Sequence, residues 1–336
     1  MNLIQKEEPV MKKIVSFFGD TSELMVELNR KAEEYAASLG LEYRWAPQIP
    51  FDEDNVVAEL QQADAGIIDV EPYGEPIFSR IKGGAKLLVR YGVGYDKVDL
   101  KAASEAGIAV ARTTAANASA VAEMALTLIL TCRRKIKQSM ARLQNGQWGR
   151  DIGNEMLGAA VGIIGYGNIG RRLKGLLTGF RCEILVYDPY LSEEAAKAEG
   201  VELVTLEDLF RRADAVSIHV PYSPETHHLV GAKELALMKP TAVIVNTARG
   251  NIIDEDALYE ALRDGKIAGA GIDVFASEPL PLDSPLRTLD NAVLTPHNSS
   301  QTVESLWNIY KVAIDICADF FAGKDSPHIL NPDYKK

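Results

Sequence analysis

Cysteine and long apolar runs are both scarce in this 336-residue sequence. The three cysteines, Cys132, Cys182 and Cys317, are too few and too widely spaced for a disulfide framework or an all-thiolate metal site, which favours a reducing, cytoplasmic location. The most apolar stretch, Ala118–Cys132, contains four polar side chains and is shorter than the roughly 20 apolar residues that span a bilayer. We therefore expect a buried helix at that stretch and no membrane partner.

Positive charge is in the minority. Lysine and arginine number 36 against 47 aspartates and glutamates, so the formal net charge is −11 at pH 7. An acidic chain repels phosphate backbones, which argues against a nucleic-acid partner. Residues 1–13 carry Lys6, Glu7 and Glu8 where a secretory signal needs an apolar core, so we expect a loose leader and no targeting segment.

Short apolar runs alternate with helical patterns along the chain, which is typical of parallel sheets with crossover helices. The predicted strands of the first third are Lys13–Phe17, Ala65–Ile68, Ala85–Arg90 and Ile108–Ala111, with helices predicted at Glu23–Leu39, Asn55–Gln62 and Leu100–Ala106. A denser series follows, with strands predicted at Ala160–Ile164, Glu183–Tyr187, Ala215–Val220, Ala242–Asn246, Ala270–Asp273 and Ala292–Thr295. Six strands of this kind make a complete dinucleotide-binding domain.

The last amphipathic pattern, Thr302–Phe321, comes after the final strand of that series, so it can return to the first domain. The predicted fold class is therefore α/β with two doubly wound parallel sheets. We expect a Rossmann NAD-binding domain at residues 110–298, inserted into a discontinuous flavodoxin-like substrate domain at residues 1–109 and 299–336.

A glycine-rich turn follows the predicted strand Ala160–Ile164. The run Gly165-Tyr166-Gly167-Asn168-Ile169-Gly170 fits G-x-G-x-x-G and opens a helical pattern, the context in which this motif indicates a dinucleotide site. Gly165 permits the tight turn, Gly167 lets the backbone approach a pyrophosphate, and Gly170 lets the helix pack close to the strand. The alternative is a purely structural turn.

Asp188 comes directly after the next predicted strand, Glu183–Tyr187, and lies 18 residues beyond Gly170. A carboxylate at that place binds the ribose hydroxyls of NAD and repels the 2′-phosphate of NADP, so we expect NADH to be preferred over NADPH. The alternative interpretation is a solvated strand end.

Polar side chains also follow three later strands: Arg249, Glu278 and His297. Hydride transfer to a 2-oxo acid needs a cation that holds the carboxylate and an acid that protonates the new alkoxide, and Arg and His suit these two tasks. Taken singly, the arginine fits a surface ion pair, the glutamate a solvated loop and the histidine a structural hydrogen bond.

Several separated blocks, in the same order, resemble the D-isomer-specific 2-hydroxyacid dehydrogenase family, which contains D-lactate, glyoxylate/hydroxypyruvate and D-3-phosphoglycerate dehydrogenases. The resemblance runs from about Asp64 to Thr302. Its blocks are Arg90–Leu100, Gly165–Gly170, His219–Pro221 with Thr226, Asn246–Gly250 with Asp254, Ile272–Phe275 with Glu278-Pro279, and Thr295–His297.

The resemblance implies a role for each matching residue. Arg249 would bind and polarise the substrate, His297 would be the acid/base, and Glu278 would hydrogen-bond His297 and favour its protonated form. The backbone N–H groups of Val93 and Gly94 would hold the substrate carboxylate. The NAD site would be lined by Gly165, Gly167, Asn168, Ile169, Gly170, Asp188, Val220, Pro221, Thr226, Thr247, Ala248, Arg249 and Asp273, with Asp273 near the nicotinamide amide.

The resemblance also implies a homodimer, because the helix from Ala118 and the arm around Trp148 match the segments that form the family's dimer interface. No metal is expected. The pair His227-His228 has no Cys, Asp or Glu at ligand spacing beside it, and adjacent side chains are expected to diverge. Cys132 and Cys317 lie on apolar helix faces and are expected to be buried thiols.

Two segments depart from the family pattern. After His297 the family often has small residues, whereas Asn298–Gln301 is polar here and is expected to alter the substrate or nicotinamide pocket. In the loop after Ala65–Ile68, which approaches the far end of the substrate in the family, Asp69 and Glu71 would repel a phosphate. This argues against 3-phosphoglycerate as substrate, unless both acids simply face water.

These patterns predict an NAD-dependent oxidoreductase that transfers a hydride between NADH and the 2-carbon of a small 2-oxo acid or D-2-hydroxy acid. The alternative is an NAD(H)-sensing binding protein, like the corepressors that share this fold. A third possibility, bound-NAD chemistry on a thioether nucleoside, has no use for the carboxylate-binding Arg249. Which 2-hydroxy acid is used, and in which direction, stays open.

Overall fold

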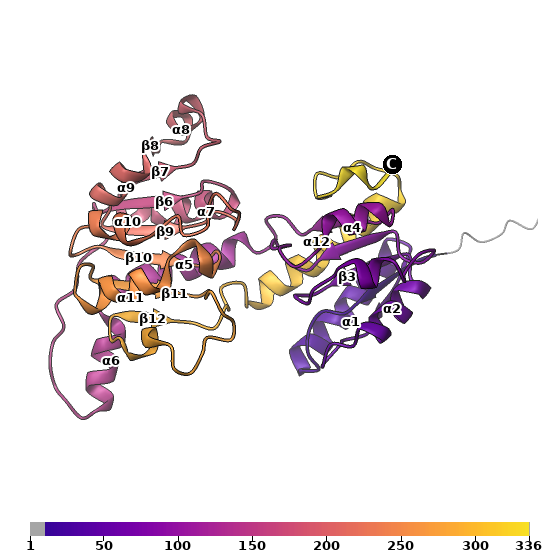
Figure 1. The fold of residues 1–336 in the computed structure, drawn as a ribbon, viewed down its shortest axis with the longest axis horizontal. Coiled ribbons are helices and arrows are strands. Elements are labelled where there is room, and N and C mark those ends of the chain that lie inside the picture. The colour runs from indigo at the N-terminus through magenta and orange to yellow at the C-terminus, as the bar shows by residue number, and fades with distance from the viewer. Residues whose placement is uncertain (1–10, 336) are drawn as a thin grey trace, which may run out of the picture. The chain divides into compact units, whose positions relative to one another are not determined.

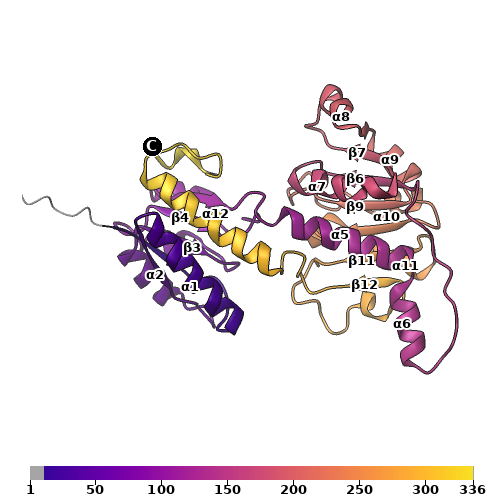
Figure 2. The same cartoon turned by 180° about the vertical axis from the view of Figure 1, so that it is seen from behind.

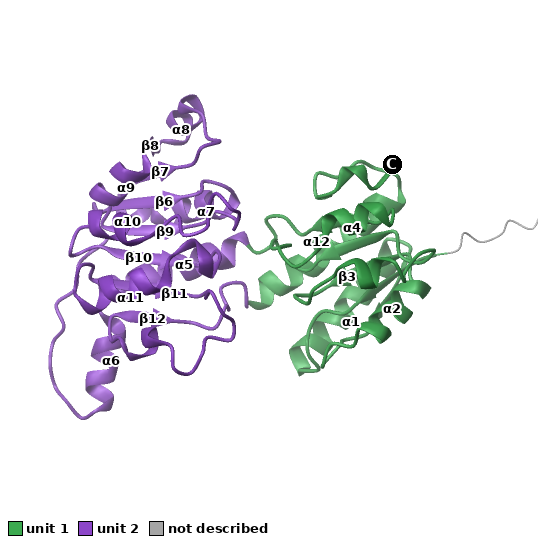
Figure 3. Ribbon diagram, viewed as in Figure 1, with its two compact units in different colours: residues 1–117, 302–336 green, residues 118–301 purple. Residues whose placement is uncertain are grey.

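The computed structural model describes residues 11–335, so most of the predicted leader, with Lys6, Glu7 and Glu8, lies outside the described residues. The chain divides into two compact units, one formed by residues 1–117 and 302–336 and the other by residues 118–301 (Figure 3). The first unit is therefore discontinuous in sequence. No helix within residues 11–335 is long and apolar enough to cross a membrane.

The first unit contains a five-stranded parallel sheet with the order β2-β1-β3-β4-β5 (Figure 1). This is the flavodoxin-like order. The strands are β1 (Lys12–Ser16), β2 (Leu41–Trp45), β3 (Ala65–Ile68), β4 (Leu87–Arg90) and β5 (Ala109–Arg112). The sequence analysis missed β2, an edge strand in which buried Leu41 and Tyr43 alternate with exposed Glu42 and Arg44.

Helices cover both faces of this sheet. One face carries α1 (Glu23–Ser38) and α12 (Val303–Phe321), which lie side by side in Figure 2. The other carries α2 (Glu53–Gln62), α3 (Glu75–Phe78) and α4 (Leu100–Glu105). The α12 helix begins where the Thr302 side chain accepts a hydrogen bond from the Ser305 N–H group. Its buried face includes Leu306, Tyr310 and Ile314, which explains why this distant segment returns to the first unit.

The second unit contains a seven-stranded parallel sheet with the order β12-β11-β10-β9-β6-β7-β8. Its strands are β6 (Ala160–Ile164), β7 (Glu183–Tyr187), β8 (Glu202–Leu203), β9 (Ala215–Ile218), β10 (Val243–Asn246), β11 (Gly269–Ile272) and β12 (Ala292–Leu294). The prediction of six strands was wrong, because β8 has only two residues at the sheet edge and shows no periodicity. From β8 to β11 the order is that of a dinucleotide-binding sheet, which reverses between β6 and β9.

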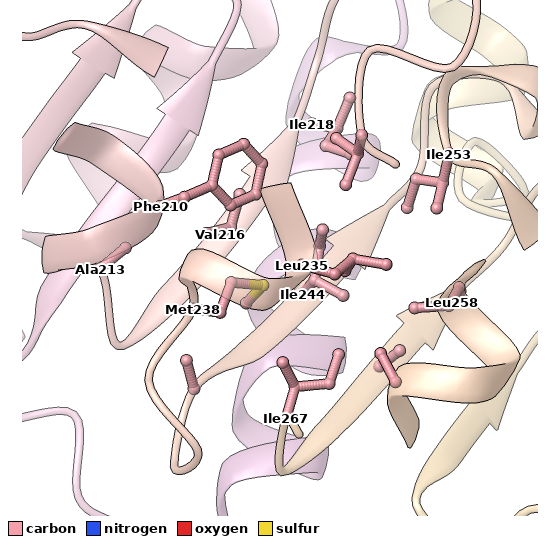
Figure 4. Close-up of a cluster of buried hydrophobic side chains, with 14 of the residues drawn as sticks. Phe210, Ala213, Val216, Ile218, Leu235, Met238, Ile244, Ile253, Leu258 and Ile267 are labelled. Atoms are coloured by element: carbon pink, nitrogen blue, oxygen red, sulfur yellow. The ribbon is translucent and has the colours of Figure 1, made fainter. Parts of the chain in front are cut away.

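The helices of the second unit also form two layers. One layer contains α5 (Ala118–Arg133), α7 (Asn168–Leu177) and α8 (Glu193–Glu199). The other contains α9 (Leu206–Arg212), α10 (Ala232–Leu237) and α11 (Glu255–Arg263). Their side chains Phe210, Leu235 and Leu258 belong to one buried cluster with Ile244 of β10 (Figure 4). The remaining helix, α6, spans Ile136–Gln144 and buries none of its side chains. The predicted fold class, two doubly wound parallel sheets, is confirmed.

Candidate active site

The glycine-rich turn has the geometry that its sequence predicts. Gly165 adopts a positive φ of 89°, and a Cβ atom there would lie 2.8 Å from the His219 carbonyl carbon. A Cβ atom at Gly170 would lie 2.5 Å from the Gly165 carbonyl oxygen. At Gly167, the residue that precedes α7, a Cβ atom would meet nothing within 4 Å. Two of the glycines therefore allow close packing, whereas the third leaves the helix N-terminus open to an anion.

Asp188 lies beside this turn. One carboxylate oxygen accepts a hydrogen bond from the Tyr166 N–H group at 2.8 Å, and the other accepts one from the Tyr190 N–H group at 2.9 Å. The structure thus brings the acid and the glycine motif together. Each carboxylate oxygen keeps a further lone pair, which can accept a hydrogen bond from a ribose hydroxyl.

The loop after β9 adjoins the same turn. The His219 N–H group donates to the Ile164 carbonyl oxygen at 2.7 Å, and a Cβ atom on Gly165 would lie 2.8 Å from Val220 Cγ1. Farther along, the Thr226 hydroxyl donates to the Pro221 carbonyl oxygen at 2.8 Å and closes the loop. Val220, Pro221 and Thr226 therefore share the carboxyl end of the sheet with the glycine turn, at the point where the strand order reverses.

The His219 side chain is partly buried and lies against Ser217 of β9. Its Nε2 atom lies 2.9 Å from the Ser217 hydroxyl, and burial lowers its pKa to about 4, so the ring is neutral at pH 7.

Arg249 is held by a residue that the sequence analysis did not single out. The Asn246 side chain, at the end of β10, donates to the Arg249 carbonyl oxygen at 2.8 Å and accepts from the Ala248 N–H group at 3.0 Å. Arg249 Nη1 donates to the Ala248 carbonyl oxygen at 2.7 Å. Asparagine at a strand end is a signal for such a turn, because its side chain mimics backbone groups. Thr247, between them, has a buried hydroxyl with no hydrogen-bond partner among the described residues.

His297 and Glu278 form a direct pair. His297 Nδ1 lies 2.8 Å from Glu278 Oε2, and Glu278 Oε1 accepts a hydrogen bond from the Phe275 N–H group at 3.0 Å. The imidazole is 45% exposed, so a ligand can reach it. The pairing orients the ring and leaves Nε2 on its other side.

Asp273 lies under the turn that carries His297. It is fully buried, and its carboxylate accepts hydrogen bonds from the Thr295 hydroxyl at 2.6 Å and from the Ser299 hydroxyl. The N–H groups of Asn298 and Ser299 donate to the same carboxylate at 3.0 and 2.9 Å. The predicted contact of Asp273 with a nicotinamide amide stays a prediction, and Thr295 and Ser299 are partners that the sequence analysis missed.

In the first unit, the loop with Val93 and Gly94 follows β4. The adjacent Gly92 N–H group donates to the Thr113 hydroxyl at 2.9 Å, and Arg112 Nη1 donates to the Val93 carbonyl oxygen at 3.5 Å. These contacts tie the loop to the end of β5. The first unit by itself therefore presents the Val93–Gly94 backbone at the carboxyl edge of its sheet.

Asp69 follows the neighbouring strand β3 at the same edge. It is partly buried, and burial raises the pKa of its carboxyl to about 6, although Arg90 favours the charged form. Its Oδ1 atom accepts a hydrogen bond from the Val70 N–H group at 2.8 Å. Glu71 is also partly buried. Both acids are therefore partly shielded from water, which contradicts the alternative that they simply face the solvent.

The expectation that the His227 and His228 side chains diverge was wrong. Their rings stack with centroids 4.0 Å apart, because His228 adopts a left-handed backbone conformation with φ 49°. His228 Nδ1 is 4.0 Å from Asp254 Oδ2. Within residues 11–335, no group of three or more His, Cys, Asp or Glu side chains is placed to hold a metal ion.

Comparison with known proteins supports the interpretation of these motifs. Residues 126–299 match the NAD-binding domain of the D-isomer-specific 2-hydroxyacid dehydrogenases. A glyoxylate reductase of Korarchaeum cryptofilum is 34% identical over 299 residues, covering 87% of this chain and 90% of that protein. A D-3-phosphoglycerate dehydrogenase of Methanocaldococcus jannaschii is 46% identical over 223 residues, covering 66% of this chain and 42% of that protein. The chain thus spans less than half the length of this second relative.

Solved structures agree over nearly the whole chain. D-2-hydroxyisocaproate dehydrogenase superimposes with a TM-score of 0.84 at 29% identity, covering 96% of this chain and 100% of that one. D-lactate dehydrogenase of Aquifex aeolicus, solved with NAD and lactic acid, has a TM-score of 0.79 at 27% identity and covers 95% of this chain and 99% of that one. These likenesses confirm the predicted enzyme class, an NAD-dependent oxidoreductase. The chain belongs to the D-isomer-specific 2-hydroxyacid dehydrogenase family.

Proposed function

We propose that this protein uses NADH to reduce a small 2-oxo acid to the D-2-hydroxy acid, or catalyses the reverse oxidation. The observation that carries the proposal is the arrangement at the ends of three adjacent strands. Arg249 follows β10, Glu278 follows β11 and His297 follows β12, and these strands pair in that order. Ligands bind outside the carboxyl ends of such strands. A carboxylate-binding cation and a carboxylate-paired histidine therefore lie at one edge.

The residues at the reversal of strand order fit NAD. Gly167 leaves open space at the start of α7, Asp188 is oriented by two backbone N–H groups, and the buried Thr247 hydroxyl has a hydrogen bond to give or accept. The pyrophosphate would bind at the helix N-terminus, and Asn168, Ile169, Val220, Pro221, Thr226 and Ala248 would line the rest of the site. The Asp188 carboxylate would repel a 2′-phosphate, which supports NADH over NADPH.

Each catalytic residue has one task in this proposal. When bound, NADH supplies the hydride to carbon 2 of the substrate. The Arg249 guanidinium binds the substrate carboxylate and polarises the adjacent carbonyl group. His297 donates a proton from Nε2 to the carbonyl oxygen, and Glu278 holds Nδ1 and stabilises the charged imidazolium. The assignment of the Val93 and Gly94 N–H groups to the substrate carboxylate is part of the proposal.

The test follows NADH consumption with glyoxylate, hydroxypyruvate, pyruvate, 2-oxoisocaproate and 3-phosphohydroxypyruvate, with NADPH in parallel. We expect NADH-dependent turnover that falls by at least about 100-fold in His297→Ala, because general acid catalysis contributes roughly 10²–10⁴-fold. His227→Ala is the matched control, since His227 is exposed and makes none of the contacts described at the active site. Unchanged turnover in His297→Ala would refute the assignment. Tight NADH binding without turnover would favour the NAD(H)-sensing alternative.

The partly buried Asp69 and Glu71 support a substrate without a phosphate. A phosphorylated group near these carboxylates would be repelled, and their partial burial weakens the screening of that repulsion by water. We expect 3-phosphohydroxypyruvate to rank last in the panel and to gain relative to hydroxypyruvate in Glu71→Gln. A phosphorylated substrate ranked first would contradict this part of the proposal.

We also propose that the protein forms a homodimer and is located in the cytoplasm. The helix α6 and the segment that follows it expose large apolar side chains, with Met140 56%, Trp148 90% and Ile152 85% exposed. Exposed apolar groups gathered on one segment mark an interaction surface. The cytoplasmic assignment is supported by the three cysteines, all of which are free thiols.

A further inference from the structure

Three consecutive N–H groups in the turn at His297 donate to one residue. The His297 N–H group donates to the Asp273 carbonyl oxygen at 2.8 Å. The next two N–H groups, of Asn298 and Ser299, donate to the two carboxylate oxygens of Asp273 at 3.0 and 2.9 Å. The backbone that carries the imidazole is therefore anchored to one fully buried residue, through its carbonyl oxygen at His297 and through its carboxylate at the next two positions.

The turn needs such an anchor. His297 has a φ of 50°, in the left-handed region that residues with a Cβ atom seldom occupy. Surrounding contacts must hold this conformation, since the histidine does not favour it by itself. The conformation matters because it sets the direction of the ring that meets Glu278 at 2.8 Å.

Two hydroxyl groups donate hydrogen bonds to the Asp273 carboxylate and hold it in place. The Thr295 hydroxyl donates to Asp273 Oδ1 at 2.6 Å, and the Ser299 hydroxyl donates to Asp273 Oδ2. Ser299 is buried, although it belongs to the polar segment Asn298–Gln301 that was expected to alter the pocket. Its side chain is instead committed to Asp273. Hydrogen bonds to a buried carboxylate are stronger than those between neutral groups, so both hydroxyls stiffen the turn.

We infer that Thr295 and Ser299 are positioning residues, which act through Asp273 to fix the direction of the His297 imidazole. The inference rests on the proposed function, in which His297 is the acid/base. Neither hydroxyl touches the reacting atoms. Losing one of them loosens the turn, so that His297 spends less time aligned with both Glu278 and the substrate.

The experiment compares two matched pairs of variants of the full-length protein. Thr295→Val removes one hydroxyl at nearly constant volume, and Thr295→Ser restores it. Ser299→Ala removes the second hydroxyl, and Thr288→Ala is its control, because Thr288 is exposed and its hydroxyl donates to the Pro285 carbonyl oxygen at 2.7 Å. Each variant is measured for kcat and for KM of NADH, and thermal unfolding shows whether it is folded.

We expect Thr295→Val and Ser299→Ala to lower kcat about tenfold, because small misplacements of a catalytic group reduce rate strongly. KM for NADH should stay within about twofold of the original value, and Thr295→Ser should recover most of the lost rate. A rise in KM for NADH with unchanged kcat would overturn the inference and would assign the network to cofactor binding.

A second readout does not depend on turnover. In NMR spectra of protein labelled with 15N at its histidines, the His297 ring signals are identified by their loss in His297→Ala. They should shift in Ser299→Ala and Thr295→Val but not in Thr288→Ala. If the unchanged protein shows no turnover, the proposed function is contradicted. The ring signals would still test whether Thr295 and Ser299 position His297 through Asp273. Unshifted signals in folded Ser299→Ala would refute the inference. If Thr295→Val does not fold, Ser299→Ala decides the question.

Discussion

Replacing Asp69 with asparagine should stabilise the first unit at neutral pH. Asp69 lies at the carboxyl end of β3, and burial raises the pKa of its carboxyl from 3.8 to about 6, with a further rise from Glu71 and an opposing effect of Arg90. Between these two pH values the folded protein holds a proton that the unfolded chain has lost. The free energy of unfolding therefore falls as the pH rises through this window.

The magnitude follows from the two pKa values. A difference of roughly two pH units corresponds to about 3 kcal/mol at full effect. Because Asp69 keeps partial contact with water, we take this as an upper value and expect Asp69→Asn to gain about 1–3 kcal/mol at pH 7. The gain should disappear below about pH 4, where the aspartate is protonated in both states.

The assay is urea unfolding at pH 7 and at pH 4, followed by the fluorescence of Trp45 and Trp307, which both belong to the first unit. Glu75→Gln, which removes an exposed carboxylate at the first residue of α3, shortly after the Asp69 loop, is the control and should change stability by less than about 0.5 kcal/mol. An equal gain at both pH values, or a loss at pH 7, would refute the reasoning, because neither follows from a buried charge.

Four further outcomes are expected. Arg249→Lys should lower kcat/KM about 100-fold, since lysine lacks the two-pronged geometry that matches a carboxylate, and a smaller change measured with the best 2-oxo acid would count against the substrate role. Asp188→Asn should raise kcat/KM with NADPH relative to NADH about tenfold, and an unchanged ratio would remove Asp188 from the cofactor site. Trp148→Asp should shift the protein from dimer to monomer in light scattering, whereas an unchanged mass would place the interface elsewhere. Burial raises the pKa of Cys132 to about 12 and that of Cys317 further, so neither thiol should react with a disulfide reagent at pH 8 until the protein is unfolded, as a thiol count would show.

The sequence predicted most strands of both sheets because buried parallel strands are continuous runs of apolar residues. The strands β3, β6 and β7 have the predicted limits. The two strands that were missed lie at sheet edges. In β2, buried side chains alternate with exposed charged ones, and β8 is only two residues long. A short or half-exposed strand is defined by its neighbour in the sheet, and that neighbour is distant in sequence.

The positions of the proposed active-site residues at strand ends could also be predicted, because each follows a strand whose end is set by the local apolar pattern. Arg249, Glu278 and His297 each follow a predicted strand, and the structure places them after β10, β11 and β12. Two contacts could not be predicted from the sequence. One is the pairing of His297 Nδ1 with Glu278 Oε2, and the other is the hydrogen bond from the Asn246 side chain to the Arg249 carbonyl oxygen. Such contacts depend on backbone directions that several strands determine together.

The sequence by itself determined the two-sheet architecture, the glycine turn and the residue types suited to dehydrogenase chemistry, because these depend on local periodicity and on spacing within one strand–turn–helix unit. Only the tertiary structure decided that Ser299 faces Asp273 and that the rings of His227 and His228 stack. The physical reason is the same in both cases. Positive φ angles at His297 and His228 redirect neighbouring side chains, and contacts among residues distant in sequence hold those angles in place.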